Sequence, residues 1–534
     1  MPPLPSAARG LVALVVLVGL AVPAVRAQTL GTALLQQYQA TITPAELAGH
    51  LYVYADDYLA GRDTGEPGQR FAARYLAGQY QTMGVAPRGS GTPASPHALD
   101  SYLQPFLLER TDLDRLSVTV SRRDEPVLRS VLDGGSAGSF APVAGAPPSD
   151  PAPARLVFAG TGTAAFDAVD MAGAYVLVLA DPAGGRADVS AMLRMAGARG
   201  ARGLILATEP TSAALSDRAA RALGPGRLAL PADSASGPFE AGGRFPYTLF
   251  TGRDVAAELM AAAGVADLAT ATPGDTGLQL SVDAETSTVR VPTENVVAIV
   301  PGSDLADEFV IVSAHLDHIG VETGGEAAAD RINNGADDDG SGTVALLEIA
   351  EAFQQARDAG HGPRRSVLLL HVTGEEKGLL GSAYYADREP LVPLAQTVAN
   401  LNIDMIGRHD PTYDGAASPY VYILGAELIS TSLDAVNTRV NAETGLGLDL
   451  SKRFNSADDP NQFFRRSDHW NFGKNGIPFI FYFTGTHEDY HQPGDEASKI
   501  DYERMATIAR LVFGTAWEVA NADARPGVSG TGFN

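Results

Sequence analysis

The sequence of 534 residues contains no cysteine. This absence excludes disulfide bonds, thiolate metal ligands, a cysteine nucleophile and lipid attachment at a signal-peptide cysteine. Positive charge is also scarce, because 39 lysines and arginines face 63 aspartates and glutamates, which gives a formal net charge of −24. Such a charge argues against nucleic acids and anionic membranes as partners. Because no disulfide bond can form, the stability of the folded protein must come from a hydrophobic core or from bound ions.

Long hydrophobic runs are missing as well, apart from Leu11–Val22 near the N-terminus. Arg9 precedes this run, and small residues up to Ala27 offer a cleavage site. The run is shorter than the roughly 20 residues of a membrane span. We therefore expect residues 1–27 to be a secretory signal peptide, with an uncleaved anchor as the alternative. After cleavage, the protein would be periplasmic or extracellular, without a membrane partner.

The composition changes along the chain and predicts more than one domain. Residues 28–106 read as helices of the larger domain, with Thr43 as a helix N-cap and Gly84 as a helix stop. Residues 107–275 form a separate α/β module that contains no histidine. Residues 276–525 complete the larger domain, and residues 526–534 are a tail.

From residue 289 onward, short apolar runs rich in valine, isoleucine and phenylalanine alternate with helical segments. Apolar runs of this kind are typical of strands that are buried on both faces. The alternation predicts an α/β fold with a mostly parallel mixed sheet flanked by helices. In open sheets of this type, functional sites form at the carboxyl ends of the strands.

Histidines and carboxylates follow these apolar runs at five places along the chain. They are His315 and Asp317, the triplet Asp337, Asp338 and Asp339, the pair Glu375 and Glu376, Asp404, and the group His487, Tyr490 and His491. At least four carboxylates in one crevice need a cation to offset their charge. Histidine and carboxylate ligands without thiolate suit zinc, with manganese or cobalt as alternatives.

Each of these signals also has a simpler reading. A histidine near a strand end is often a hydrogen-bonded surface group, and an aspartate-rich turn is often a solvated helix cap. The triplet region also fits calcium, because Asp337, Asp339, Ser341, Gly342 and Glu348 stand at positions 1, 3, 5, 6 and 12 of an EF-hand loop. However, a glycine-containing loop precedes the triplet where an EF-hand needs a helix. The set as a whole therefore favours a pair of transition-metal ions.

Six motifs in this order resemble those of the co-catalytic zinc exopeptidases. They are "HLDHIG", "GADDDGSG", "GEEKGLLGS", "NIDMIG", "SDHWNF" and "DYHQPGDE". That family includes secreted bacterial aminopeptidases and glutamate carboxypeptidase II, with glutaminyl cyclases as relatives. The resemblance implies a zinc-exopeptidase fold, also described as phosphorylase/hydrolase-like. Residues 107–275 resemble a protease-associated domain inserted after the N-terminal helices.

The resemblance also implies two zinc ions per chain. The ligands it implies are His315 and Asp404 for one ion, Glu376 and His491 for the other, and Asp338 as the bridge between them. It implies a cis peptide bond after Asp338.

Three further residues receive roles from the resemblance. Glu375 would be the general base that activates a metal-bridging water. Asp317 would orient the imidazole of His315, and Tyr490 would stabilise the oxyanion. Asp468 and His469 lie in a motif near the site but are not assigned as ligands.

The expected function is a secreted zinc aminopeptidase that hydrolyses the N-terminal bond of a peptide or small protein. The alternatives are a carboxypeptidase or dipeptidase on the same site and, less favoured, a glutaminyl cyclase or a non-catalytic peptide-binding protein. Arg408 could pair with a substrate carboxylate, although a structural ion pair is the preferred reading. Nothing in the sequence sets the oligomeric state.

Overall fold

The computed structural model describes residues 31–92, 99–123, 125–145, 147–148, 150–180, 186–223, 226–231, 246–322, 330–415, 419–456 and 458–530. The predicted signal peptide lies outside these residues. The chain forms two compact units, one from residues 1–106 and 292–534 and the other from Leu107–Val291. Among the described residues, no helix is both long and apolar enough to span a bilayer.

The centre of the first unit is a parallel four-stranded sheet. Its strands, in spatial order, are β13 (Arg365–Val372), β12 (Leu305–His315), β14 (Thr397–Ile403) and β17 (Phe479–Phe483). His315 pairs with Val372, and Ser313 pairs with Asn402. The carboxyl ends of these strands therefore reach the same edge of the sheet.

Antiparallel strands flank this parallel centre. Beside β13 lies β11 (Gly274–Val300), which also pairs with β1 (Ala86–Pro87). Beside β17 lies β15 (Tyr420–Gly425), which continues into a parallel pairing with β16 (Asp449–Ser451). The prediction of a mostly parallel mixed sheet is confirmed.

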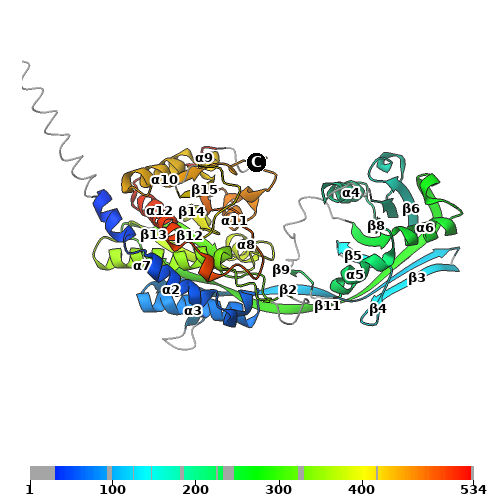
Figure 1. Cartoon of the computed structure of the whole chain (residues 1–534), viewed down its shortest axis with the longest axis horizontal. Helices are drawn as coiled ribbons and strands as arrows, with labels where there is room; N and C mark the ends of the chain where they lie inside the picture. The colour runs from blue at the N-terminus through cyan, green and yellow to red at the C-terminus, as the bar shows by residue number, and fades with distance from the viewer. Residues whose placement is uncertain are drawn as a thin grey trace, which may run out of the picture. The chain divides into compact units, whose positions relative to one another are not determined.

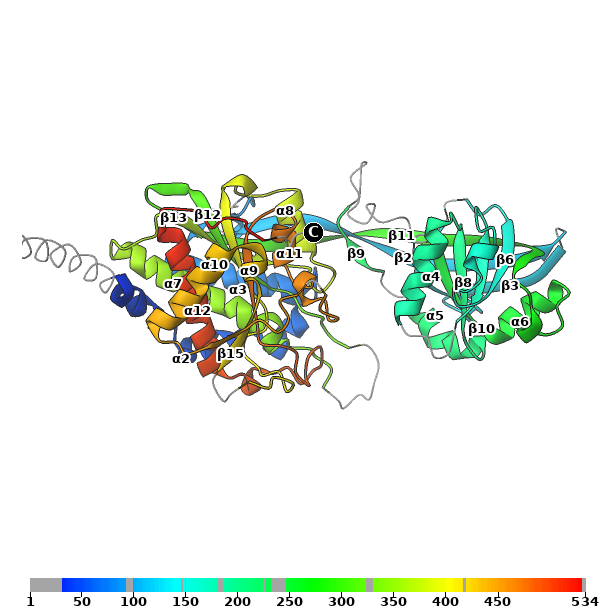
Figure 2. The ribbon, with the colours of Figure 1, turned by 90° about the horizontal axis from the view of Figure 1, so that it is seen from above.

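Helices cover both faces of this sheet, as Figures 1 and 2 show. Alternate residues of a strand point to opposite faces, so Val310 and Val312 of β12 join one core while Phe309 and Ile311 join another. The helices of the first core are α2 (Pro44–Tyr54), α3 (Pro67–Met83), α7 (Gly342–Asp358), α10 (Thr431–Thr444) and α12 (Tyr502–Asn521). The second core is closed by α8 (Leu380–Asp387) and α11 (His469–Gly473), whereas α9 (Ala426–Ile429) follows β15. Burial on both faces explains the uninterrupted apolar runs in the sequence.

The N-terminal helices begin and end at the residues that the sequence indicates. The side chain of Thr43 accepts a hydrogen bond from the backbone N–H of Glu46 and so caps α2. Gly84 ends α3 with a left-handed φ of 74°. Between these helices, the short helix η1 (Asp57–Arg62) leads to the edge of the sheet where the site lies.

The second unit has its own parallel sheet, formed by β6 (Ala154–Thr161), β7 (Tyr175–Leu179), β8 (Gly203–Glu209) and β10 (Tyr247–Gly252). Antiparallel β5 (Ala141–Ala144) and the start of β11 close its two edges. The core on one face includes α4 (Arg186–Ala198), and the core on the other includes α5 (Ser216–Ala222) and α6 (Arg253–Ala262).

An antiparallel ribbon completes the second unit, made of β2 (Leu103–Arg122), β3 (Glu125–Asp133) and β4 (Ser136–Ala137), with β9 (Leu228–Ala229) beside β2. The unit begins at Leu107, where the sequence places the start of the inserted module. It ends at Val291 instead of residue 275, because β11 continues without interruption past the predicted boundary.

Candidate metal centre

Asp338 lies at the centre of the site, in the turn η7 (Ala336–Ser341) that precedes α7. Its Oδ1 is 3.1 Å from Nε2 of His315, and its Oδ2 is 3.0 Å from Nε2 of His491. The two oxygens of one carboxylate thus face two different histidines. This is the arrangement expected of a carboxylate that bridges two cations.

A second carboxylate accompanies each histidine. Asp404 follows β14, and its Oδ1 is 3.7 Å from Nε2 of His315. Glu376 follows β13, and its Oε2 is 3.3 Å from Nε2 of His491. The structure therefore brings all five expected ligands together, in the two groups that the family resemblance implies.

The other two aspartates of the triplet organise the backbone of the site. Asp339 is fully buried, and its carboxylate accepts hydrogen bonds from the backbone N–H groups of His315, Gly342 and Met405. Asp337 accepts one from the backbone N–H of Gly407 at 2.6 Å. The three adjacent carboxylates thus point to three different sets of partners. The expected cis peptide bond between Asp338 and Asp339 is confirmed.

The buried carboxylate of Asp495 fixes the backbone of this turn. Its oxygens accept hydrogen bonds at 3.1 Å from the backbone N–H groups of Asp337 and Asp338. On the other side of the same turn, His487 places Nε2 3.4 Å from Oδ2 of Asp337. His487 therefore lies beside the turn and belongs to neither ligand group.

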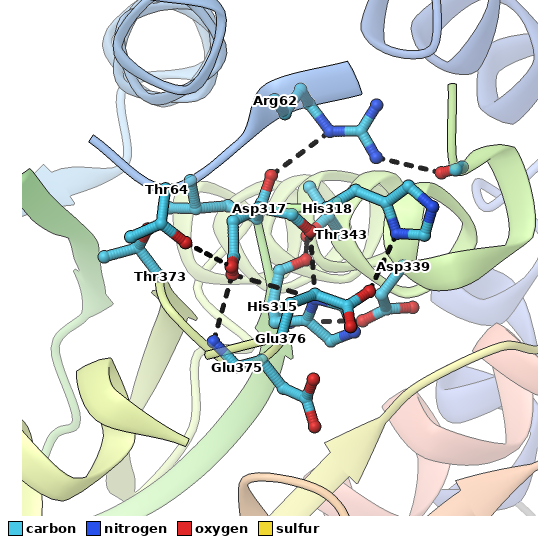
Figure 3. A network of polar contacts seen from close by, with 12 residues as sticks. Arg62, Thr64, His315, Asp317, His318, Asp339, Thr343, Thr373, Glu375 and Glu376 are labelled. Carbon is cyan, nitrogen blue, oxygen red and sulfur yellow. Dashed lines mark hydrogen bonds and ion pairs between the residues drawn. The ribbon is translucent and has the colours of Figure 1, made fainter. Parts of the chain in front are cut away.

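Asp317 acts differently from the expectation. Its carboxylate accepts hydrogen bonds from the hydroxyl of Thr64 at 2.7 Å and from the backbone N–H of Glu375 at 3.2 Å, as Figure 3 shows. Nδ1 of His315 contacts the backbone carbonyl of Asp317 at 3.1 Å, whereas its distance to the carboxylate is 3.9 Å. The carbonyl therefore orients the imidazole, and the carboxylate positions the backbone of the predicted base.

The N-terminal segment supplies part of this framework, which the sequence did not indicate. Arg62 is buried and donates hydrogen bonds to the backbone carbonyls of Leu316, Asn334 and Gly335. Its guanidinium also lies over the ring of Tyr54 at 4.6 Å. Arg62 thus ties the loop after β12 to the loop before η7.

The charges of the site show that its residues fit divalent cations. Burial opposes charge on His315 and His491, but Asp338 and the neighbouring carboxylates raise the pKa of His315 well above its usual range and that of His491 to about 10. In the protein alone, protons on the histidines thus offset the carboxylates. Nε2 of His315 and Oε1 of Glu376 are buried without a hydrogen-bond partner among the described residues. A cation at each of the two positions, one beside His315 and one beside Glu376, would replace the protons and satisfy both atoms.

A pocket opens beside the predicted ligands, and Glu375 lines it. Burial raises the pKa of Glu375 well above its usual range, and the nearby carboxylate of Glu376 raises it further. Tyr490 also lines the pocket, with its ring stacked on His491 at a centroid distance of 3.9 Å. Burial raises the pKa of the Tyr490 hydroxyl, which therefore remains protonated.

Arg466 is a pocket residue that the sequence analysis missed. It donates a hydrogen bond from Nη2 to the hydroxyl of Tyr490 at 3.3 Å. In the sequence, the only sign that Arg466 lies near the site was its position two residues before the aspartate of the "SDHWNF" motif. Arg408, which was considered instead, pairs with Glu488 at 3.2 Å and Asp489 at 3.0 Å. These contacts therefore support the structural ion pair for Arg408, and not a pairing with a substrate carboxylate.

Asp468 and His469 lie outside both ligand groups. Asp468 accepts a hydrogen bond from the hydroxyl of Ser382, and burial raises its pKa to about 7. Nε2 of His469 donates to the carbonyl of Phe464 at 3.0 Å, and burial lowers the pKa of this histidine to about 3. Both side chains support the packing around α11.

Comparison with known proteins agrees with this geometry. Residues 295–516 match the sequence profile of peptidase family M28. A probable leucine aminopeptidase of Trichophyton verrucosum is 31% identical over 237 residues, which are 42% of this chain and 57% of that protein. A probable glutamate carboxypeptidase of Arabidopsis thaliana is 30% identical over 170 residues, which are 32% of this chain and 22% of that protein. The chain thus spans less than two thirds of either relative.

Among solved structures, an aminopeptidase from Aneurinibacillus sp. strain AM-1 superposes with a TM-score of 0.52 at 19% identity. The superposition covers 92% of this chain and 97% of that one. It confirms the predicted fold. The match of residues 295–516 to peptidase family M28 therefore agrees with the resemblance to the co-catalytic zinc exopeptidases.

Proposed function

We propose that this protein is a secreted, zinc-dependent aminopeptidase that acts on peptides. The observation that carries the proposal is the position of Asp338, whose two carboxylate oxygens lie 3.1 and 3.0 Å from His315 and His491. Each histidine has a second carboxylate beside it, and Glu375 lines the adjoining pocket. In a purely structural ion-pair network, buried polar atoms are expected to have hydrogen-bond partners, whereas several of these atoms lack one beside the pocket.

Two zinc ions fit the donor set, with Asp338 shared between them. One would be held by His315 and Asp404, and the other by Glu376 and His491. Bound there, they would supply Lewis acidity that polarises the scissile carbonyl and makes water more acidic.

Glu375 would move the proton in this reaction. Its carboxylate lines the pocket and its backbone is held by Asp317, whereas the neighbouring Glu376 faces the histidines. Glu375 would accept a proton from the attacking water and pass it to the departing amine.

Tyr490 is placed to stabilise charge on the carbonyl oxygen. Its hydroxyl accepts a hydrogen bond from Arg466, so its own proton can be donated to a substrate oxygen. The guanidinium of Arg466 would strengthen this donor as negative charge develops.

The wall of the pocket favours an apolar substrate side chain. Met405, Phe463, Phe481 and Phe483 line it. Aromatic and thioether groups of this kind bury a leucine or phenylalanine side chain more favourably than a charged one. We therefore expect a preference for large apolar residues at the cleaved N-terminus.

A carboxypeptidase is the second candidate, because Arg466 places a cation in the pocket. A guanidinium there could pair with the C-terminal carboxylate of a substrate. The name of the Arabidopsis thaliana relative agrees with this reading.

A comparison of substrates tests both candidates. The aminopeptidase should hydrolyse leucyl-anilide, lose this activity with a chelator, and fail on N-acetyl-leucyl-anilide, which lacks the free amine. Release of a C-terminal residue from an N-blocked peptide would support the carboxypeptidase instead. No chelator-sensitive hydrolysis of any of these substrates would contradict the proposal.

We also propose that the second unit is a protease-associated domain and that residues 1–27 direct export. The α/β architecture of Leu107–Val291 supports the first statement, and the apolar run Leu11–Val22 supports the second. N-terminal sequencing of the exported protein should give Gln28 as the first residue. An exported protein that still began at Met1 would contradict cleavage.

A further inference from the structure

We propose that His318 is a third histidine of the metal centre, and that it binds, through Nδ1, the cation held by Asp338 and Glu376. The inference rests on the proposed function, because it adds a ligand to the same pair of cation positions. Sequence reasoning did not select His318, although it stands in the "HLDHIG" motif three residues after His315.

The distances fit a shared cation. Nδ1 of His318 lies 2.9 Å from Oε1 of Glu376 and 3.9 Å from Oδ2 of Asp338. Zinc binds nitrogen and oxygen at about 2.1 Å, so two ligands of one ion lie at most about 4.2 Å apart. Both contacts meet this limit.

The orientation of these atoms favours coordination over a direct hydrogen bond. His318 is 0% exposed, and neither ring nitrogen has a hydrogen-bond partner among the described residues. Oε1 of Glu376 also lacks one, although it is only 2.9 Å from Nδ1. At that distance, a missing hydrogen bond means that the ring N–H direction does not point at the oxygen. These two atoms form a close ion pair, yet neither has a hydrogen bond of good geometry among the described residues, which is typical of ligands aimed at an ion between them.

The surrounding structure fixes the ring of His318 in this orientation. The backbone N–H of His318 donates to the carbonyl of Arg62 at 3.2 Å. A Cβ atom added to Gly335 would come within 2.6 Å of Cγ and Cδ2 of the ring, so the backbone packs directly against it. The ring of His491 meets it edge-on at a centroid distance of 5.6 Å. His318 cannot turn away from Glu376 without moving this framework.

Two histidines at one cation position have a measurable consequence. His491 has a side chain that is 35% exposed, whereas His318 is buried. If both bind the cation, the variant His491→Ala should retain part of its affinity at this position because His318 remains. The double variant His318→Ala/His491→Ala should lose binding at this position.

Cation affinity tests the proposal on the full chain. The cation-free protein is titrated calorimetrically with Zn²⁺ in wild-type, His318→Ala and His371→Gln forms. His371 is a matched control, because it is equally buried and contacts the hydroxyl of Tyr80 away from the ligand groups. We expect His318→Ala to lower the zinc affinity of one of the two sites by about 100-fold or more. This is the upper end of the loss caused by removing a residue that only contacts a metal ligand. We expect His371→Gln to leave both sites unchanged, and unchanged affinities in His318→Ala would overturn the proposal.

A second measurement needs no substitution and separates ligation from positioning. With ¹¹³Cd²⁺ bound to ¹⁵N-histidine-labelled wild-type protein, through-bond coupling appears only at nitrogens bonded to the metal. We expect coupling at three histidines, one of them through Nδ1. Coupling at only His315 and His491 would overturn the inference and leave the proposed function intact. A wild-type protein that bound no divalent cation would overturn both.

Discussion

Three adjacent aspartates perform three different tasks in this protein. Asp338 faces two histidines, Asp339 accepts three backbone N–H groups, and Asp337 holds the backbone of Gly407. Burial raises the pKa of Asp339 well above its usual range, whereas contacts with His315 and His491 overcome burial and lower that of Asp338. Identical side chains therefore acquire different protonation behaviour from their hydrogen-bond partners.

The variant Glu375→Gln should keep both cations and the fold while losing most turnover. The amide has nearly the same shape as the carboxylate but cannot accept a proton at this step. A general base contributes typically about 10²–10⁴-fold to the rate, so kcat should fall within that range. Steady-state kinetics on leucyl-anilide, with zinc content measured in parallel, checks the expectation. Full activity in this variant would show that another group is the base.

His371 should make stability depend on pH. Burial lowers its pKa from the usual 6.5 to about 3. At a pH between these two values, the unfolded state therefore binds a proton at this histidine and the folded state does not. Its contribution to stability is present above about pH 6.5 and is lost as the pH falls toward 3. At pH 5 the loss is on the order of 2 kcal/mol.

Urea unfolding of the cation-free protein at pH 7 and pH 5 measures this effect. The variant His371→Gln cannot take up the proton, so its free energy of unfolding should fall less between the two pH values than that of the wild type. Equal changes in the two proteins would contradict the assignment.

At the scale of elements, the site is built from the ends of parallel strands. A predicted ligand lies at the carboxyl end, or in the loop that follows it, of each of the strands β12, β13, β14 and β17. The turn η7 adds the predicted bridging aspartate. The sequence predicts this convergence, because buried parallel strands are recognisable and their carboxyl ends must share an edge. It does not predict the contribution of η1, because Arg62 reaches the site by donating to backbone carbonyls of loops that lie far from it in the sequence.

Removal of Asp495 should loosen the turn that carries Asp338. The variant Asp495→Ala leaves the backbone N–H groups of Asp337 and Asp338 buried without acceptors, at a cost of about 1–3 kcal/mol each. Because the bridging carboxylate is then less firmly positioned, zinc affinity should fall by about 10- to 100-fold. Calorimetric titration and thermal unfolding measure the two effects.

The variant Asp501→Ala is the matched control. Asp501 also accepts a backbone N–H, that of Arg504, but it is an exposed cap of α12. Its loss should cost about 1 kcal/mol and leave zinc affinity unchanged. Equal zinc affinities in Asp495→Ala and the wild type would show that the turn keeps its shape without the carboxylate.

At the scale of the whole molecule, the first unit combines both ends of the chain around one core. Residues of α2 and α3 pack with those of α7 and α12, although the second unit separates them in sequence. The described part of the predicted tail also contacts this unit, since the backbone N–H groups of Ser529 and Gly530 donate to the carbonyl of Ile429. The predicted cation ligands all belong to this unit, so binding should stabilise it specifically.

Chelation should lower the unfolding temperature of the first unit. Cations that bind only the folded state stabilise it by about 2.7 kcal/mol for each site at a concentration 100-fold above Kd. Both tryptophans, Trp470 and Trp517, lie in α11 and α12, so their fluorescence reports this unit alone. The transition should shift down with a chelator and return with added zinc.

The variant Asp338→Asn provides the control for chelation. It removes a ligand shared by both cation positions, so its unfolding temperature should respond little to the chelator. A wild-type transition that was insensitive to the chelator would contradict cation binding at this site.

The sequence by itself determined the fold class and the strand ends that carry histidines and carboxylates, and its resemblance to a known family singled out His315, Glu376, Asp404 and His491 as the four residues that meet at Asp338. These depend on local patterns, because apolar runs define strands and parallel strands align their carboxyl ends. Only the tertiary structure decided the partners of each polar group. It showed that a backbone carbonyl contacts the imidazole of His315, that Arg466 lines the pocket and that His318 lies against Glu376. Such contacts join residues that lie far apart in the chain. What these residues can bind depends on the burial and the orientation of their side chains, and the spacing of residues in the sequence reveals neither.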